Sequence, residues 1–106
     1  MELNCDKVRN VKQCIEIATT DAHDEDEAAS GWHACFEDVF DGIEEVKLWD
    51  ETVKLSGFGF SKNAVVAIVE KKKKKIKVTL DSIQPIKPTK VHLLWLKAWQ
   101  EWQKGY

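Results

Sequence analysis

The chain has 106 residues, of which 43% are hydrophobic and 32% charged, with five tryptophans and a formal net charge of −2. This composition supports a packed core and excludes an intrinsically disordered chain. The length is that of one ordinary domain, and no apolar run approaches the roughly 20 residues that span a bilayer. We therefore expect a single domain over residues 1–106 and no membrane partner.

The first part of the chain, about residues 6–41, has the spacing of helices. Apolar residues recur three and four positions apart at Val8, Val11, Ile15, Ala18 and Ala22, and again at Ala29, Trp32, Phe36 and Phe40. Two interpretations are open at Thr19 and Thr20, which either cap a second helix or mark a kink in one long helix. Gly42 is a natural left-handed end to this helical region.

Acidic residues dominate the same half of the chain. From Glu16 to Glu51 there are thirteen acids and one base, Lys47. The acids are Glu16, Asp21, Asp24, Glu25, Asp26, Glu27, Glu37, Asp38, Asp41, Glu44, Glu45, Asp50 and Glu51. Most lysines come later, with Lys71 to Lys75 as an unbroken block, so the sequence is acidic first and basic second.

Residues of about 43–90 alternate in the manner of short strands. Two such stretches cover 45–49 and 52–57, "AVVAIVE" is a continuous β-branched run, and "KIKVTL" alternates strictly. The lysines between the last two stretches predict a hairpin with its tip at 71–74. Pro85 and Pro88 confine a short last strand to an edge.

A C-terminal helix is expected over about 91–103. Its apolar residues are Val91, Leu94, Trp95, Ala98, Trp99 and Trp102. The tryptophan stripe is most simply explained by packing of this helix on the strands. The pattern as a whole predicts an α+β fold, a small SH3-like antiparallel β-barrel flanked by a long N-terminal helical region and a C-terminal helix.

The cysteines and histidines do not suggest catalysis. The three cysteines, Cys5, Cys14 and Cys35, form no CxxC motif and no signal peptide precedes them, which favours free thiols in a reducing cytoplasm. A zinc site would need His23, His33, Cys35 and His92, and only His33 and Cys35 are close in sequence. No acid pattern or glycine-rich loop supports a Cys–His nucleophile, so we expect no enzyme.

Three stretches resemble one known family. "DAHDEDEAASGW" is similar to a D-A-Y-D-E-E-E motif followed after three residues by G-W, "VTLDSIQPI" to V-P-L-S-Q-L-E-P-I, and the ending "WQEWQKGY" to W-x-x-W followed by G-Y. In this respect the chain resembles the small bacterial calcium-binding proteins of the CcbP type. The resemblance implies a helix, small barrel and helix, and a calcium ion as partner. It departs from the family at His23, at residues 33–35 and in the lysine hairpin.

Calcium takes six to eight oxygen ligands, often several carboxylates, and the acids here do not follow the EF-hand pattern. Two candidate ligand sets remain. Asp21, Asp24 and Glu25 would share one helix face through their i, i+3, i+4 spacing. Asp38 and Asp41 lie at the helix end, where free carbonyls and the negative end of the dipole favour a cation, with Glu37, Glu44 and Glu45 nearby.

The sequence thus predicts a cytoplasmic, non-enzymatic calcium-binding protein, a buffer or sensor, with Ca²⁺ as its only cofactor. The alternative is a metal-free interaction module, in which the acidic helix contacts a basic protein or the lysine hairpin contacts nucleic acid. The lysine block carries no interleaved arginine and no evident stacking aromatics, which disfavours nucleic acid.

Overall fold

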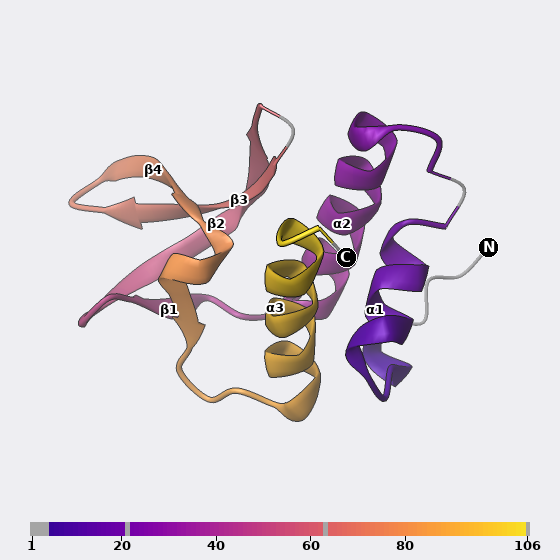
Figure 1. Ribbon diagram of the computed structural model, residues 1–106. Helices are drawn as coiled ribbons and strands as arrows, with labels where there is room; N and C mark the ends of the chain where they lie inside the picture. The colour runs from indigo at the N-terminus through magenta and orange to yellow at the C-terminus, as the bar shows by residue number, and fades with distance from the viewer. Residues whose placement is uncertain (1–4, 21, 63, 106) are drawn as a thin grey trace.

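The computed structural model describes residues 5–20, 22–62 and 64–105, without the side chains of Asp6 and Glu25. Within these ranges the elements follow one another as helical turn, helices, strands and helix (Figure 1). They are η1 (Cys5–Lys7), α1 (Val11–Ala18), α2 (Glu25–Val39), β1 (Glu45–Leu48), β2 (Glu51–Ser61), β3 (Ala64–Lys71), β4 (Lys74–Thr79), η2 (Leu80–Ser82), β5 (Ile83–Pro85) and α3 (Lys90–Gln103). The fold is α+β, as the sequence predicts.

The three α-helices lie together on one side of the molecule and the sheet on the other (Figure 1). α3 therefore packs mainly on the other helices, and the two helical regions do not flank the sheet as the sequence suggested. The reason is the aromatic core. Trp32 of α2 is fully buried, and the rings of Trp95, Trp99 and Trp102 of α3 lie 5.8, 5.4 and 5.6 Å from it.

The sheet is antiparallel with strand order β4-β3-β2-β1-β5. In the described ranges β4 and β5 are edge strands, so the structure contains an open five-stranded sheet and the predicted barrel closure is not observed. β5 is short and lies at an edge, as its proline predicts. The predicted lysine hairpin is confirmed by the pairing of Lys71 with Lys74.

The helical region is divided into two helices, as one of the two interpretations at Thr19 and Thr20 predicts, but neither threonine caps the second helix. Their hydroxyls donate to the carbonyls of Ile15 and Glu16, one turn back, at the end of α1. The N-cap of α2 is Asp24, whose carboxylate accepts the Glu27 amide at 2.9 Å. A carboxylate satisfies the free amides of a first turn and favours the positive end of the dipole, so the new helix begins only after Asp24.

Gly31 lets α2 pass close to α1. A Cβ atom at this position would overlap the carbonyl oxygen of Ala18, which is main chain and cannot move aside. The glycine of the G-W pair in the sequence is therefore a packing requirement. It brings the next residue, Trp32, into the core against α3.

The three cysteines are buried at the junction of η1, α1 and α2. Burial raises the pKa of the Cys14 thiol to about 12. A hydrogen bond with the Cys5 thiol, together with burial, raises the pKa of Cys35 still further. The Cys14 and Cys35 thiols are therefore protonated core side chains.

Candidate metal site

Of the three acids in the helix-face set, only Asp24 has a side chain that the structure describes. Asp21 lies outside the described residues, and the side chain of Glu25 is not described. Asp24 precedes the helix as its N-cap, and Glu27 accepts the His23 amide at 2.9 Å. Since the helix starts after Asp24, this residue does not belong to a face of the helix. Asp24 and Glu27 serve the start of α2.

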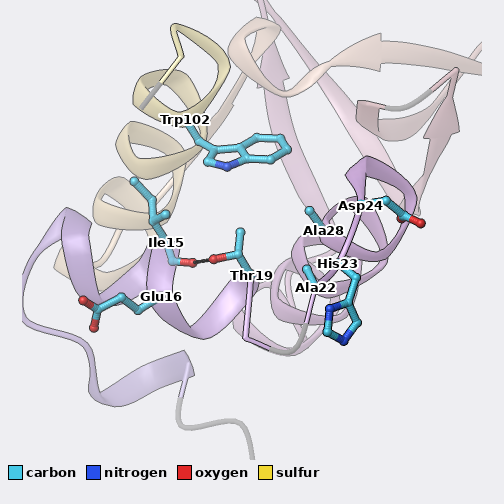
Figure 2. A pocket seen from close by; sticks show the side chains of 8 residues that line it. All are labelled: Ile15, Glu16, Thr19, Ala22, His23, Asp24, Ala28 and Trp102. Carbon is cyan, nitrogen blue, oxygen red and sulfur yellow. Dashed lines mark hydrogen bonds between the residues drawn. The ribbon is translucent and has the colours of Figure 1, made fainter.

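A hollow of about 560 Å³ lies beside this helix start, between α1, α2 and α3 (Figure 2). Trp102, Ile15 and Ala28 contribute much of its apolar wall. The carboxylates of Glu16 and Asp24 lie on opposite sides and point away from one another, as Figure 2 shows. Because carboxylates must converge to hold a cation, this hollow is a poor candidate for a metal site.

Of the helix-end set of acids, Asp41 lines a hollow in the structure and Asp38 does not. A smaller hollow of about 150 Å³ lies between the end of α2 and β2, and both Glu37 and Asp41 line it. Glu37 lies in the last turn of α2 and Asp41 lies two residues past its end at Val39, so both border the hollow from the end of this helix. Asp38 does not line the hollow. Its charge acts instead on the buried Cys35 thiol, where it adds to the larger effects of Cys5 and burial.

The opposite wall of this hollow comes from an irregularity in β2. Leu55 pairs with Val69 and Gly57 with Ile68, so Ser56 is an extra residue, as in a β-bulge. Gly57 has φ +152, a value that favours glycine, and Ser56 and Gly57 both line the hollow. The bulged segment of β2 and the end of α2 thus line the same hollow. We call this hollow, with Glu37, Asp41, Ser56 and Gly57, the helix-end site.

The C-terminal end of α2 is fixed from two directions. Gly42 has φ +85 and follows the helix, as predicted, while the Ile43 amide donates to the Phe40 carbonyl at 3.1 Å. His92 of α3 accepts the Thr89 amide on Nδ1 at 3.2 Å, so Nε2 carries the hydrogen and donates to the Val39 carbonyl at 3.2 Å. The expectation that the last carbonyls are free is therefore wrong for Val39 and Phe40.

His33 joins the helix-end site to the sheet. Its Nε2 lies 3.0 Å from the Phe58 carbonyl and 3.3 Å from Glu37 Oε1, and its ring stacks on Phe60 at 4.8 Å. Both neighbours of Nε2 are acceptors, so this nitrogen bears the hydrogen. The contact holds the Glu37 carboxylate toward β2.

The remaining acids near the helix end belong to another hollow. Glu44 and Glu45 line a space of about 290 Å³ together with Lys87 and Pro85. The lysine supplies positive charge there, which disfavours a metal ion. The helix-end site has no lysine or arginine in its lining.

Metal-ligating side chains do not gather elsewhere in the described ranges. Among those residues, no group of three or more His, Cys, Asp and Glu side chains is placed to hold a metal ion. The four residues of the zinc hypothesis stay apart: Cys35 is buried, His33 contacts Phe58, and His92 contacts Val39. In the helix-end site, two carboxylates must therefore be completed by main-chain oxygens and water. An all-oxygen donor set fits a hard cation such as calcium.

Sequence reasoning gave Glu37 only a supporting role. No sequence pattern distinguishes Glu37, which lines the hollow, from Asp38, which does not. The participation of Ser56 and Gly57 had no sequence signal either, because a bulge depends on the register between β2 and β3.

These features define an α+β protein with three packed helices, an open antiparallel sheet and an acidic hollow between the two layers. The fold is shared with the crystal structure of CcbP from Anabaena, with a TM-score of 0.72, over 92% of this chain and 94% of that chain. The sequences are 18% identical, so the resemblance seen in the sequence is confirmed at the level of the fold. No protein-family model and no curated protein matches the sequence.

No helix in the described part of the chain is long and apolar enough to cross a bilayer.

Proposed function

We propose that this protein binds calcium at the helix-end site and acts as a non-enzymatic buffer or sensor in the cytoplasm. The observation that carries the proposal is the hollow of about 150 Å³ in which Glu37 and Asp41 face the bulged segment of β2. The fold shared with CcbP, and the sequence motifs of that calcium-binding type, support the choice of ion.

The site suits a weak and hydrated complex. Two carboxylates offer up to four oxygens, and calcium takes six to eight ligands, so main chain and water must supply the rest. A water occupies roughly 30 Å³ of the liquid, so the hollow has room for an ion with a few waters. Few charged ligands and several retained waters correspond to affinities of roughly 10⁻⁴–10⁻³ M.

The Glu37–His33 contact must compete with the ion. At 3.3 Å, His33 Nε2 holds one oxygen of the carboxylate that calcium would use. Replacing His33 by Phe keeps an aromatic ring beside Phe60 and removes the competing donor. We expect tighter calcium binding in this variant.

Titration calorimetry of the full chain tests the function. Calcium should release or absorb heat with saturation in the millimolar range and raise the melting temperature, and magnesium should bind less well because it is reluctant to lose water. Glu37→Gln and Asp41→Asn should each weaken binding by about tenfold or more. Asp38→Asn makes the same change of charge at the residue next to Glu37, which does not line the hollow, and should have little effect. The absence of both heat and thermal stabilisation at millimolar calcium would refute the proposal.

We make two further inferences about the fold. We infer that the chain forms one folding unit, because the buried core joins η1, all three α-helices and the sheet. We also infer that the sheet is a relative of SH3-like barrels, supported by a last strand, β5, that returns beside β1. A single cooperative melting transition by both circular dichroism and tryptophan fluorescence tests the first inference.

A further inference from the structure

Two hairpin turns lie at the same end of the sheet. Trp49 and Asp50 form the turn between β1 and β2, and Lys72 and Lys73 form the turn between β3 and β4. In an antiparallel meander these turns fall at one end, and in Figure 1 both tips point away from the helices, to the left. A salt bridge joins them, with Lys71 Nζ 3.0 Å from Glu51 Oε2. We call Trp49, Asp50 and Lys71–Lys75 the hairpin end.

The hairpin end combines an exposed aromatic ring with uncompensated positive charge. Trp49 is 71% exposed, more than any other large hydrophobic side chain in the described part of the chain. Lys72–Lys75 are all exposed, and none of them has an ion-pair partner within 4.0 Å among the described residues. Of the nearby acids, Glu51 and Glu70 are already paired with Lys71 and Lys54, which leaves the single carboxylate of Asp50 against the four lysines Lys72–Lys75.

The backbone of both turns is costly for the residues that occupy it. Trp49, Lys72 and Lys73 have φ values of 58°, 51° and 66°, in the left-handed region that favours glycine or asparagine. A turn with positive φ at both central residues is type I′, for which Asn-Gly is preferred. The turns are therefore occupied by side chains that the backbone alone would not select, which points to a role at the surface.

We propose that the hairpin end is a docking site for an anionic phospholipid surface. Lysines attract anionic headgroups without any specific geometry, and tryptophan is enriched where protein meets the membrane interface. Two projecting tips joined by a salt bridge present one ring and several ammonium groups to the same plane.

A single strand of nucleic acid fits the hairpin end less well. Such strands bind in basic grooves that offer stacking rings to successive bases. The hairpin end is a pair of projecting turns with one exposed ring and no arginine, since Arg9 in the N-terminal part is the chain's sole arginine. The sequence predicted no membrane partner because no segment spans a bilayer; attachment to its surface needs no such segment.

Vesicle flotation with the full chain tests the proposal, with a chelator present so that calcium plays no part. We expect binding to vesicles of equal parts phosphatidylcholine and phosphatidylserine, no binding to phosphatidylcholine alone, and a loss of binding as salt rises. The double variant Lys72→Asn with Lys73→Gly should weaken binding by roughly 25-fold, about fivefold for each lysine, and should flatten its salt dependence. Trp49→Asn should lower the affinity and leave the salt dependence unchanged.

Lys62 provides a matched control. It is an exposed lysine with φ 56° in the turn between β2 and β3, at the other end of the sheet. Lys62→Asn removes a charge from the same kind of turn, and we expect vesicle binding to be unchanged. The matching single variant at the hairpin end is Lys72→Asn, and equal losses in Lys62→Asn and Lys72→Asn would overturn the proposal, because they would show attraction by net charge alone. Failure to float with the anionic vesicles, or binding of a short single-stranded oligonucleotide in preference to them, would overturn it as well.

Discussion

The helix-end site and the hairpin end both carry concentrated charge, but their backbones differ. At the end of α2 the positive φ of 85° falls on Gly42, which accepts it at little cost, and the carboxylates sit on a well-capped helix. At the hairpin end the positive φ values fall on Trp49, Lys72 and Lys73. The first region combines charge with good local structure. In the second region, tryptophan and lysine side chains occupy a backbone conformation that costs local stability.

Trp95 and Trp49 lie at the two extremes of burial, so their substitution gives the largest expected difference in stability. Trp95 is fully buried, and its Nε1 donates to the Cys5 carbonyl at 2.7 Å, so Trp95→Ala should lower the free energy of unfolding by about 3–5 kcal/mol. Trp49→Ala removes an exposed side chain and should change it by less than about 0.5 kcal/mol. Urea denaturation measures both. Similar losses in the two variants would show that Trp49 is a structural residue.

The position of α2 depends on Gly31. Gly31→Ala forces a methyl group against the Ala18 carbonyl and should destabilise the fold by about 1–3 kcal/mol or more. Ser30→Ala, one residue earlier on the exposed side, should be close to neutral. A Gly31 variant as stable as wild type, measured by thermal melting, would contradict the close packing of α1 on α2.

Substitutions in a turn of the hairpin end should stabilise the protein, whereas Gly31→Ala destabilises it. Replacing Lys72 by Asn and Lys73 by Gly relieves two left-handed residues and should stabilise the protein by about 1–2 kcal/mol. Lys75→Thr removes a charge from β4 without relieving the backbone, so it should have a smaller effect. A destabilised double variant would mean that the lysines support the hairpin.

Substitution of Asp24, the N-cap of α2, tests whether the calcium ligands lie at the start or at the end of this helix. Asp24→Ala should cost about 1 kcal/mol, since the Glu27 amide loses its acceptor, and it should leave calcium affinity unchanged. Asp26→Ala changes the same charge in the first turn without removing a cap and should cost less. If Asp24→Ala weakened calcium binding as much as Asp41→Asn, the helix-end assignment would be wrong.

The sequence predicts local elements better than their assembly. The C-terminal helix, the lysine hairpin and the edge position of β5 follow from apolar spacing, a charge block and a proline. The start of α2 after Asp24 was not predicted, because the apolar spacing runs on to Ala22, past the end of α1 at Ala18. The open sheet, the packing of α3 on α2 and the β2 bulge depend on contacts between distant residues, which periodicity does not contain.

The two predicted ligand sets also differ in how far local sequence patterns determine their positions. Asp41 was placed at the end of the helix because that end can be predicted from Phe40 and Gly42. Asp24 was assigned to a helix face because its role as a cap depends on where α2 starts. The exposure of Trp49 was not predicted either, since it depends on the two-residue turn that pairs Leu48 with Glu51.

Nuclear magnetic resonance titration with calcium tests the central claim most directly, because it locates the ion. The account predicts saturable shifts of the backbone amides of Asp41, Gly42, Ser56 and Gly57, with little change at Asp24 and Glu27 or at Lys72 and Lys73. Shifts concentrated at the start of α2, with none at the end of α2 and the β2 bulge, would contradict it.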